Sequence, residues 1–347
     1  MRFAILVVVF GGCTWVYDSQ YDDRASELEE ARSEFLPGSE QVKFLSQGTK
    51  KLYWVNLAKP LDKERLHSFD PATNAQLDYT FTNDESNLDE NYTFGDSLIA
   101  RCSFGTSKVF DATQPNTQIS STTLGEDNCA VDGNAVYFEV ANEIRKWVPT
   151  GAGDDPVKVV DLTLQGVGQG TGAFAATGNT MVYAEGSRVW HIALDTGIAT
   201  WLENDNQAIG QAVFDEVGVA FQTQNGVDYI KFSDHSRIAV EDAIADGGYK
   251  LNYKNDDIQD LASTPEMVIF EKHLIYRSVR GIFALGLESG KVTDLLLDRG
   301  ESFETKPSYH SPVVTSDGTL FVQDRPFLNS SGDDQPVYRV DLTDRLH

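Results

Sequence analysis

The sequence predicts an all-β protein built from a repeated unit, and three observations support this prediction. The 347 residues include 28 Gly, 19 Phe and 13 Tyr but only 3 Met, a composition that favours strands and turns. Short aromatic and β-branched runs recur, each after a turn. From the turn glycine Gly48 to Gly318, six repeats span 270 residues, a period of 45. A period of about 40–50 residues with four strands per unit is typical of a single β-propeller, because each sheet buries its faces only against its neighbours.

Seven such units are visible between residues 42 and 342, which predicts seven four-stranded blades. Six or eight blades stay open as alternatives, because residues 244–260 stretch the interval between the fifth and sixth units and the second unit is irregular. Second strands are expected at residues 51–55, 97–101, 135–138, 180–183, 218–221, 273–276 and 319–322. Third strands are expected at residues 65–69, 108–110, 144–147, 188–192, 228–232, 281–285 and 337–341.

The seventh unit ends after its third strand, at Asp341-Leu342. Since natural sheets avoid exposed, unpaired edges, the missing fourth strand must come from elsewhere in the chain. Two sources are open: the segment before Gly48, or residues 14–17. Residues 42–46 also suit the inner strand of the first blade. The sequence therefore predicts closure of the ring by the N-terminal part of the chain.

Residues 1–12 are predicted to be a lipoprotein signal peptide. One basic residue precedes an apolar run at residues 3–10, which is far shorter than the roughly 20 residues needed to span a bilayer. The following Gly11-Gly12-Cys13 resembles the lipobox of bacterial lipoproteins, which implies that Cys13 carries the lipid and is the only membrane attachment. Thr14, in place of Asp, favours the outer membrane. The alternative is a buried strand with an incidental cysteine.

Residues 13–40 are expected to form a polar tether, and the propeller to span residues 41–347. Leu28, Ala31 and Phe35 lie at helical spacing among Glu and Arg residues, which predicts a short helix within residues 18–35 that Pro37-Gly38 ends. Two roles are open for this helix. It either holds the propeller away from the bilayer or packs on the propeller as a lid or edge cover.

Two turns add a family resemblance. Residues 193–201 (ALDTGIATW) and 284–291 (ALGLESGK) resemble the Ala-x-Asp-x-x-Thr-Gly-x-x-x-Trp repeat of quinoprotein-type (PQQ-like) propellers. The resemblance implies the fold. It does not imply the quinone cofactor, which dehydrogenases of this type hold with adjacent cysteines that this chain lacks. A lipid-anchored PQQ-like propeller is also similar in layout to the propeller lipoprotein of the outer-membrane β-barrel assembly machinery.

Cys102 and Cys129 are the two cysteines that remain after Cys13. They fall in the second strand of one unit and the first strand of the next, so a disulfide between them is feasible in an oxidising compartment. The chain-entropy estimate for this separation is about 3–4 kcal/mol. Two buried thiols are the alternative. Packing between blades is the expected role of four tryptophans, Trp54, Trp147, Trp190 and Trp201.

Other side chains give no catalytic or metal-binding pattern, and no cofactor is predicted. The six histidines are scattered without zinc-ligand spacing, and no Gly-x-Ser-x-Gly motif is present. Five acidic pairs could offer oxygen ligands to Ca²⁺, but they lack the spacing of a calcium loop. These pairs are Asp84-Glu85, Asp89-Glu90, Asp154-Asp155, Asp256-Asp257 and Asp333-Asp334. The net charge of -25 argues against nucleic-acid binding, which requires basic side chains.

These observations favour a non-enzymatic binding or scaffold protein of the bacterial cell envelope, with another envelope protein or a surface ligand as its partner. The long insertions at residues 56–64, 245–260 and 323–335, the last with Arg325 and Phe327, are expected to cluster at the rims of the ring. The alternative function is a carbohydrate-active hydrolase or lyase that uses paired carboxylates on one face.

Overall fold

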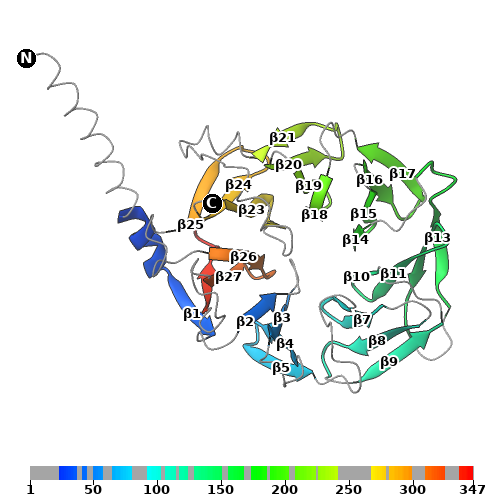
Figure 1. The fold of residues 1–347 in the computed structure, drawn as a ribbon, viewed down its shortest axis with the longest axis horizontal. Helices are drawn as coiled ribbons and strands as arrows, with labels where there is room; N and C mark the ends of the chain where they lie inside the picture. Colours follow the sequence, from blue (N-terminus) through cyan, green and yellow to red (C-terminus); the bar gives the residue numbers. More distant parts are fainter. Residues whose placement is uncertain are drawn as a thin grey trace, which may run out of the picture.

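A ring of seven antiparallel sheets, each with four strands, makes up the computed structural model (Figure 1). The chain is a seven-bladed β-propeller. The structure describes residues 23–36, 41–44, 50–57, 65–79, 92–102, 106–114, 117–123, 129–150, 155–167, 173–185, 188–202, 208–223, 226–240, 267–278, 281–298, 309–324 and 336–346. The expected alternatives of six or eight blades are thereby excluded, and the all-β class is confirmed, with a short helix at residues 23–30.

Within blades 1 to 6 the four strands follow one another as hairpins, from the ring centre outward. Blades 1 to 3 consist of β2 (Gln41–Phe44), β3 (Leu52–Leu57), β4 (Arg65–Asp70) and β5 (Ala75–Tyr79); β6 (Tyr92–Phe94), β7 (Leu98–Arg101), β8 (Ser107–Asp111) and β9 (Gln118–Thr122); and β10 (Cys129–Asp132), β11 (Ala135–Val140), β12 (Glu143–Trp147) and β13 (Val157–Asp161). Blades 4 to 6 consist of β14 (Ala173–Thr177), β15 (Thr180–Glu185), β16 (Arg188–Ala193) and β17 (Ile198–Leu202); β18 (Ala208–Phe214), β19 (Gly218–Thr223), β20 (Gly226–Lys231) and β21 (Arg237–Ala239); and β22 (Met267–Phe270), β23 (His273–Ser278), β24 (Gly281–Gly286) and β25 (Val292–Leu297).

Blade 7 combines the two ends of the chain. Its order is β26 (Tyr309–Val314), β27 (Thr319–Asp324), β28 (Val337–Asp341) and, outermost, β1 (Arg32–Leu36). The register pairs Ser33 with Arg339 and Glu34 with Tyr338. The closing strand therefore comes from the segment before Gly48, one of the two expected sources, whereas residues 14–17 lie outside the described part of the chain.

The helix expected within residues 18–35 is wrong at its C-terminal end, because the described helix covers residues 23–30 and β1 follows it. The propeller thus includes β1, from Arg32, and does not begin at residue 41. The Phe35 ring lies 4.7 Å from Phe69, 5.1 Å from Phe321 and 5.9 Å from Trp54, measured between ring centroids. These contacts, together with pairing to β28, outweigh helix propensity, which is weak in short helices.

The helix at residues 23–30 packs on the outside of blade 6, beside β25 (Figure 1). Ala25 and Leu28 are buried in the same hydrophobic cluster as Leu297 of β25. The guanidinium of Arg24 pairs with the carboxylate of Asp294 on β25 at 2.8 Å. Of the two roles considered for this helix, the described residues show the edge cover.

Two of the turns between first and second strands lack the repeated glycine, and the structure shows how each is made. In blade 5 the Asp215 carboxylate accepts the backbone N–H groups of Val217 and Gly218, at 2.8 and 2.9 Å. In blade 6, Glu271 and Lys272 adopt the left-handed conformation, with φ of 44° and 64°. The carboxylate and the two left-handed residues thus form the turns that a glycine forms elsewhere.

Candidate functional site

The long insertions begin and end at the same end of the ring. In a four-stranded hairpin sheet, the connections from second to third strand and from fourth strand to the next blade lie at one end. The expected insertions at residues 56–64 and 323–335 join second to third strands, and that at residues 245–260 joins blade 5 to blade 6. Most of their residues, including Arg325 and Phe327, lie outside the described chain. We call this end the connection face; its described polar residues include Arg101, Glu139, Asp228, Arg277, Asp298, His310, Gln323 and Asp324.

At the connection face, the end of a second strand bonds to the following blade. Glu139 of β11 is buried, and its carboxylate accepts a hydrogen bond from the Tyr183 hydroxyl of blade 4 at 3.0 Å. The buried Gln323 side chain of β27 donates to the backbone carbonyl of Val42 in blade 1. Both side chains occupy the fifth position of their strand. A polar residue at this position of a largely apolar second strand is the signal in the sequence that marks such a contact.

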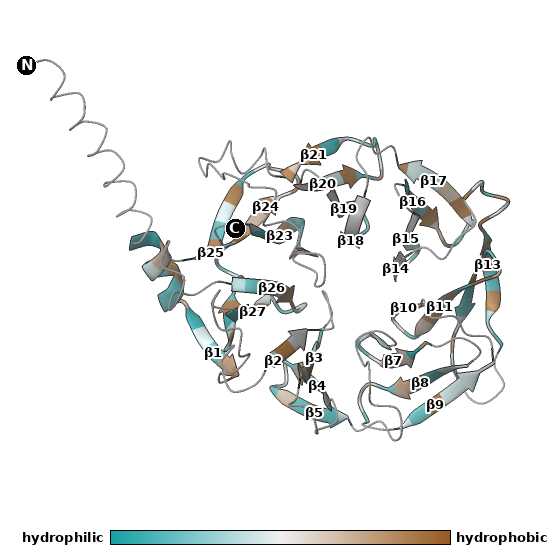
Figure 2. Cartoon of the chain, viewed as in Figure 1, coloured by the Kyte–Doolittle hydropathy of each residue, from teal (hydrophilic) through white to brown (hydrophobic). Residues whose placement is uncertain are grey.

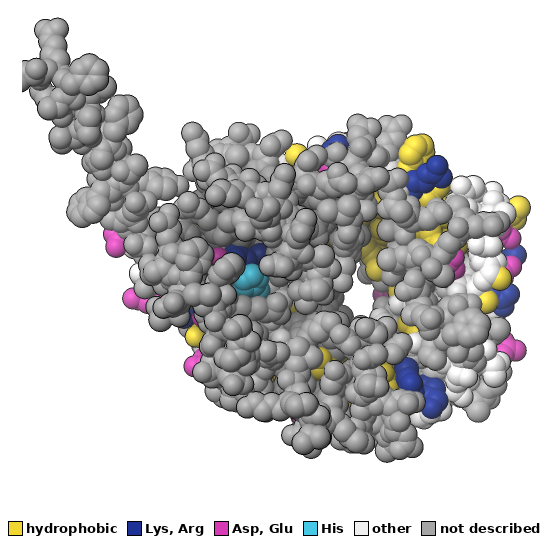
Figure 3. All heavy atoms as spheres, in the orientation of Figure 1, with side chains coloured by type: hydrophobic (Ala, Val, Ile, Leu, Met, Phe, Trp, Pro, Cys, Tyr) yellow, Lys and Arg dark blue, Asp and Glu magenta, His cyan; other side chains and the backbone are white. Residues whose placement is uncertain are grey.

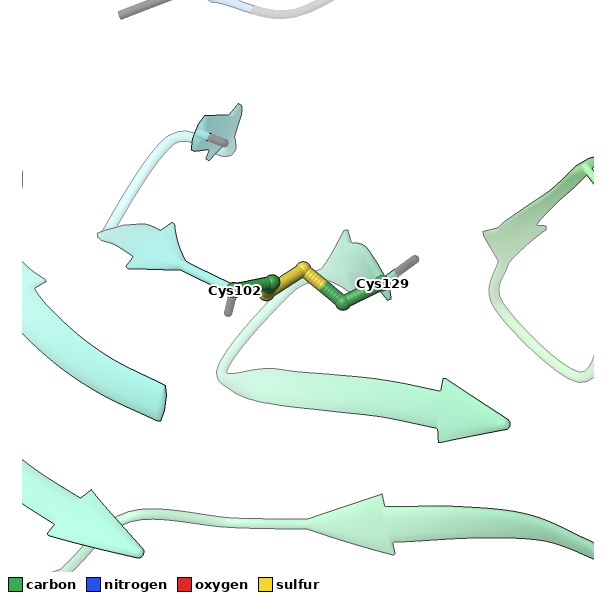
Figure 4. Close-up of a disulfide and its surroundings, with 2 residues drawn as sticks. All are labelled: Cys102 and Cys129. Carbon is green, nitrogen blue, oxygen red and sulfur yellow. A yellow bond between two sulfur atoms is a disulfide. The ribbon is translucent and has the colours of Figure 1, made fainter. Parts of the chain in front are cut away.

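Between blades 2 and 3 the corresponding link is a disulfide. Cys102, directly after β7, is bonded to Cys129, the first residue of β10 (Figure 4). Their Cα atoms lie 6.2 Å apart, within the range that disulfides require. The position of Cys13 lies outside the described residues.

An ion pair at the edge of blade 6 is hydrogen-bonded to the start of blade 7. Arg277, near the end of β23, contacts the Asp298 carboxylate at 2.7 Å, with the Arg277 side chain almost completely buried. The other Asp298 oxygen accepts the backbone N–H of Tyr309, the first residue of β26, at 3.0 Å. One carboxylate therefore fixes the start of the last inner strand. In the view of Figure 3, histidine, basic and acidic side chains gather in the region of β26.

A bulge follows at once in β26. The register with β27 shifts between His310 and Val313, so that Ser311 and Pro312 face one residue of the partner strand. Ser311 is buried and left-handed, with φ of 53°. Bulges turn a strand and change the direction of neighbouring side chains. Here the bulge follows the half-buried His310 at the connection face, which the sequence analysis did not single out; Pro312 within a strand was the available signal.

Arg32 connects the closing strand to the interior of blade 7. Its guanidinium bonds to Glu29 at 2.6 Å and lies 3.7 Å from the centroid of the Tyr338 ring. It also donates to the hydroxyl of Tyr309. Burial raises the pKa of Tyr309 far above its ordinary value, so this hydroxyl remains neutral and accepts the bond. This arrangement fastens β1 to the blade that it completes.

The described residues contain no group of three or more His, Cys, Asp or Glu that could hold a metal ion. Five of the six histidines are described, and His347 is not. Of the five acidic pairs considered for Ca²⁺, only Asp155 is described, on the surface, and the rest lie outside the described chain. The buried Asp228 carboxylate pairs with Arg237 at 2.6 Å.

The expectation for the tryptophans is wrong at one position. Trp54, Trp147 and Trp190 are buried between blades, whereas Trp201 is 50% exposed on β17, the outer strand of blade 4. The reason is its place in the blade. An outermost strand has a neighbouring strand on one side only, and Trp201 sits beside Trp190 in the register without being covered by it.

Comparison with known proteins identifies the fold alone. No family model and no curated protein matches the chain. Among solved structures, two of the extracellular domain of BT4673 from B. thetaiotaomicron, described as a one component system and as a hybrid two component system, align with TM-scores of 0.52. They are 10% and 9% identical over 89% of this chain, which spans 40% and 39% of theirs. A prolyl endopeptidase structure aligns with a TM-score of 0.49 at 13% identity, over 98% of this chain and 52% of its own.

This chain therefore spans only about half or less of the length of these solved relatives. At such identities the likeness concerns the propeller fold. Within the part of the chain that is described, no helix has the length and apolar character needed to cross a membrane.

Proposed function

We propose that the protein is a non-enzymatic binding scaffold of the bacterial cell envelope, attached to the outer membrane through a lipid on Cys13. The observation that supports this proposal is the topology of the ring, in which all three long insertions begin and end at the connection face, because loops commonly carry the binding residues of a protein. At the connection face, three buried or half-buried carboxylates are already bonded: Glu139 to Tyr183, Asp228 to Arg237, and Asp298 to Arg277 and Tyr309. Those contacts support a structural role for these carboxylates.

The partner is another envelope protein or a surface ligand. Charge narrows the choice, because a protein of net charge -25 repels nucleic acids and other polyanions and attracts cationic surfaces. The two turns that resemble the PQQ-like repeat share one backbone geometry, which supports the propeller fold of this scaffold. Gly197 and Gly290, both with φ of 67°, donate to the carbonyls four residues earlier at 2.8 and 2.7 Å.

Anchoring and binding are tested separately. Cells fed a labelled fatty acid should incorporate it into the wild-type protein and not into the Cys13→Ser variant.

Crosslinking of intact cells should recover a defined envelope protein, and the yield should fall when residues 325–335 are replaced by a Gly-Ser linker of equal length. A labelled Cys13→Ser variant would contradict the lipid anchor. Turnover of a polysaccharide, lost in a folded Asp298→Asn variant, would favour the carbohydrate hydrolase or lyase instead.

A further inference from the structure

Exposed hydrophobic side chains concentrate at the outer junction of blades 3 and 4. Among the described residues, six large hydrophobic side chains are exposed, and five of them lie between residues 148 and 201. Four of these define what we call the rim patch: Val157 (61% exposed), Leu164 (80%), Ile198 (55%) and Trp201 (50%). Single exposed apolar residues are ordinary, but a cluster of them marks an interaction surface.

Two contacts bring blades 3 and 4 together at the rim patch, where Ile198 and Trp201, three residues apart in β17, lie on opposite faces of that strand. The backbone N–H of Ala199 on β17 donates to the side-chain oxygen of Gln165, in the turn after β13, at 3.1 Å. Gly197 lies so close to β13 that a methyl group on its Cα would be 3.0 Å from the carbonyl oxygen of Val159. In Figure 2, β17 is mainly pale and brown, whereas β13 has both brown and teal segments along this outer edge.

Among the described residues, the edge of β17 is capped by the Gln165 side chain, and the strand itself carries none of the sequence features that usually protect an edge. Proteins protect edge strands with charges, prolines, bulges or a covering element. Strand β17, with the sequence IATWL, has no charge or proline and pairs with β16 over five successive residues without a register shift. By contrast, β1, β5, β13, β21 and β25 each carry a charged residue, and the pairing of β9 is shifted by an irregularity.

The hydrogen-bonding direction of this edge follows from Gln165. Because Gln165 binds the N–H of Ala199 from outside blade 4, that N–H points away from β16. Directions alternate along a strand, so the N–H of Trp201 points the same way. An added strand would replace Gln165 at Ala199 and bond to Trp201 next to it.

We propose that β17 binds a basic, extended segment of another protein by strand addition, with its apolar side chains on the rim patch. Strand addition supplies affinity through backbone bonds and specificity through alternate side chains. The net charge of -25 attracts a basic segment. It disfavours a second copy of this chain as the partner, because that copy would carry the same charge and be repelled. The inference deepens the proposed function, since it names the mode of docking of a partner.

The test uses the purified protein and a defined probe. The probe is a fluorescent ten-residue peptide of alternating valine and lysine, and its control has the same sequence with N-methyl groups on alternate residues, which block pairing along one edge. Fluorescence anisotropy should show binding of the first peptide and about tenfold weaker binding of the second, the equivalent of losing roughly 1.4 kcal/mol.

Variants locate the binding surface. Trp201→Lys should weaken binding about tenfold or more, as expected for loss of an aromatic anchor. Gln165→Ala should strengthen it, because the N–H of Ala199 becomes accessible. Val217→Lys is the matched control: it changes an exposed hydrophobic residue outside the rim patch and should leave binding unchanged. The unfolding midpoint of each variant verifies its folding.

Two outcomes would overturn the proposal. One is equal binding of both peptides, or binding that Trp201→Lys does not change. The other is a dimer in sedimentation that Trp201→Lys abolishes, which would make a second copy the occupant. Neither experiment involves Cys13 or residues 325–335, so the proposed function can stand where this inference fails, and the reverse.

Discussion

The outer edges of blades 6 and 7 and those of blades 3 and 4 are built in opposite ways. At blade 6 the helix at residues 23–30 covers β25, and Leu28 and Arg24 fasten it there. At blade 7 the last place in the sheet is filled by β1. At blades 3 and 4, Gln165 bonds to the edge of β17, and Ile198 and Trp201 remain exposed.

This difference shows that residues 23–36 cover the exposed strand edges on one side of the ring. Residues 23–36 supply both the cover of β25 and the closing strand, which pairs with β28. The opposite side is held from within, by the bond between Glu139 and Tyr183 and by the nearby disulfide of Cys102. Its outer surface is therefore left for interaction, and four experiments test the contrast.

Deletion of residues 23–36 should have the largest effect. It exposes the edges of β25 and β28 and removes the buried Leu28 and the Arg32 contacts, so we expect a loss of about 5 kcal/mol or more, comparable with the stability of many whole domains. Urea unfolding measures the loss. A synthetic peptide of residues 23–36 should restore the midpoint when added. An unchanged midpoint would show that residues 23–36 do not contribute to the stability of the propeller.

Replacement of both Cys102 and Cys129 by alanine should be next in size. The disulfide closes a separation of 27 residues, and its removal should lower the free energy of unfolding by about 3–4 kcal/mol. Thermal unfolding of the wild type with and without reductant is the parallel measurement. Rapid maleimide labelling of both residues in the unreduced, denatured protein would show that the two thiols are free.

Leu28→Ala and Leu164→Ala compare a covered with an open edge at one residue type. Leu28 is 3% exposed and should lose about 3 kcal/mol on truncation, since the variant leaves a cavity. Leu164 is 80% exposed and should change stability by less than about 0.5 kcal/mol. Equal losses, measured by denaturant unfolding, would remove the distinction between the two edges.

Gly197→Ala and Gly290→Ala should give the smallest contrast. Both glycines have φ of 67°, so both variants carry the strain of a left-handed alanine, about 1 kcal/mol. Only at Gly197 does the new methyl group meet another blade, 3.0 Å from the Val159 carbonyl oxygen. Gly197→Ala should therefore lower the thermal midpoint further than Gly290→Ala; the reverse order would mean that blades 3 and 4 separate easily.

The repeated strands were predictable because each carries its own signal. Runs such as residues 135–138 and 281–285 combine aromatic and β-branched residues with turns at a fixed period, and they appear as β11 and β24. Local pattern could not identify β1, however. Leu28, Ala31 and Phe35 fit one helix, and only the distant β28 edge and the ring of Phe321 make residues 32–36 a strand.

The contacts between blades could not be predicted from the sequence, for a related reason. The sequence shows Glu139, Asp298 and Gln323 only as polar residues near strand ends. Their partners depend on the rotation between neighbouring sheets, which the repeat period does not specify. The prediction that Trp201 is buried was wrong for a similar reason. An outer strand and an inner strand have the same aromatic composition, and only the place in the blade decides burial.

The closing strand also has a consequence for biosynthesis. The guanidinium of Arg339 bonds to Ser33, 306 residues earlier in the chain. Strand β1 is therefore synthesised long before its partner β28, and such distant pairings form slowly. Until residues 337–341 have been made, β1 has no strand to pair with in blade 7, so a truncation before β28 would be as harmful to this blade as loss of β1.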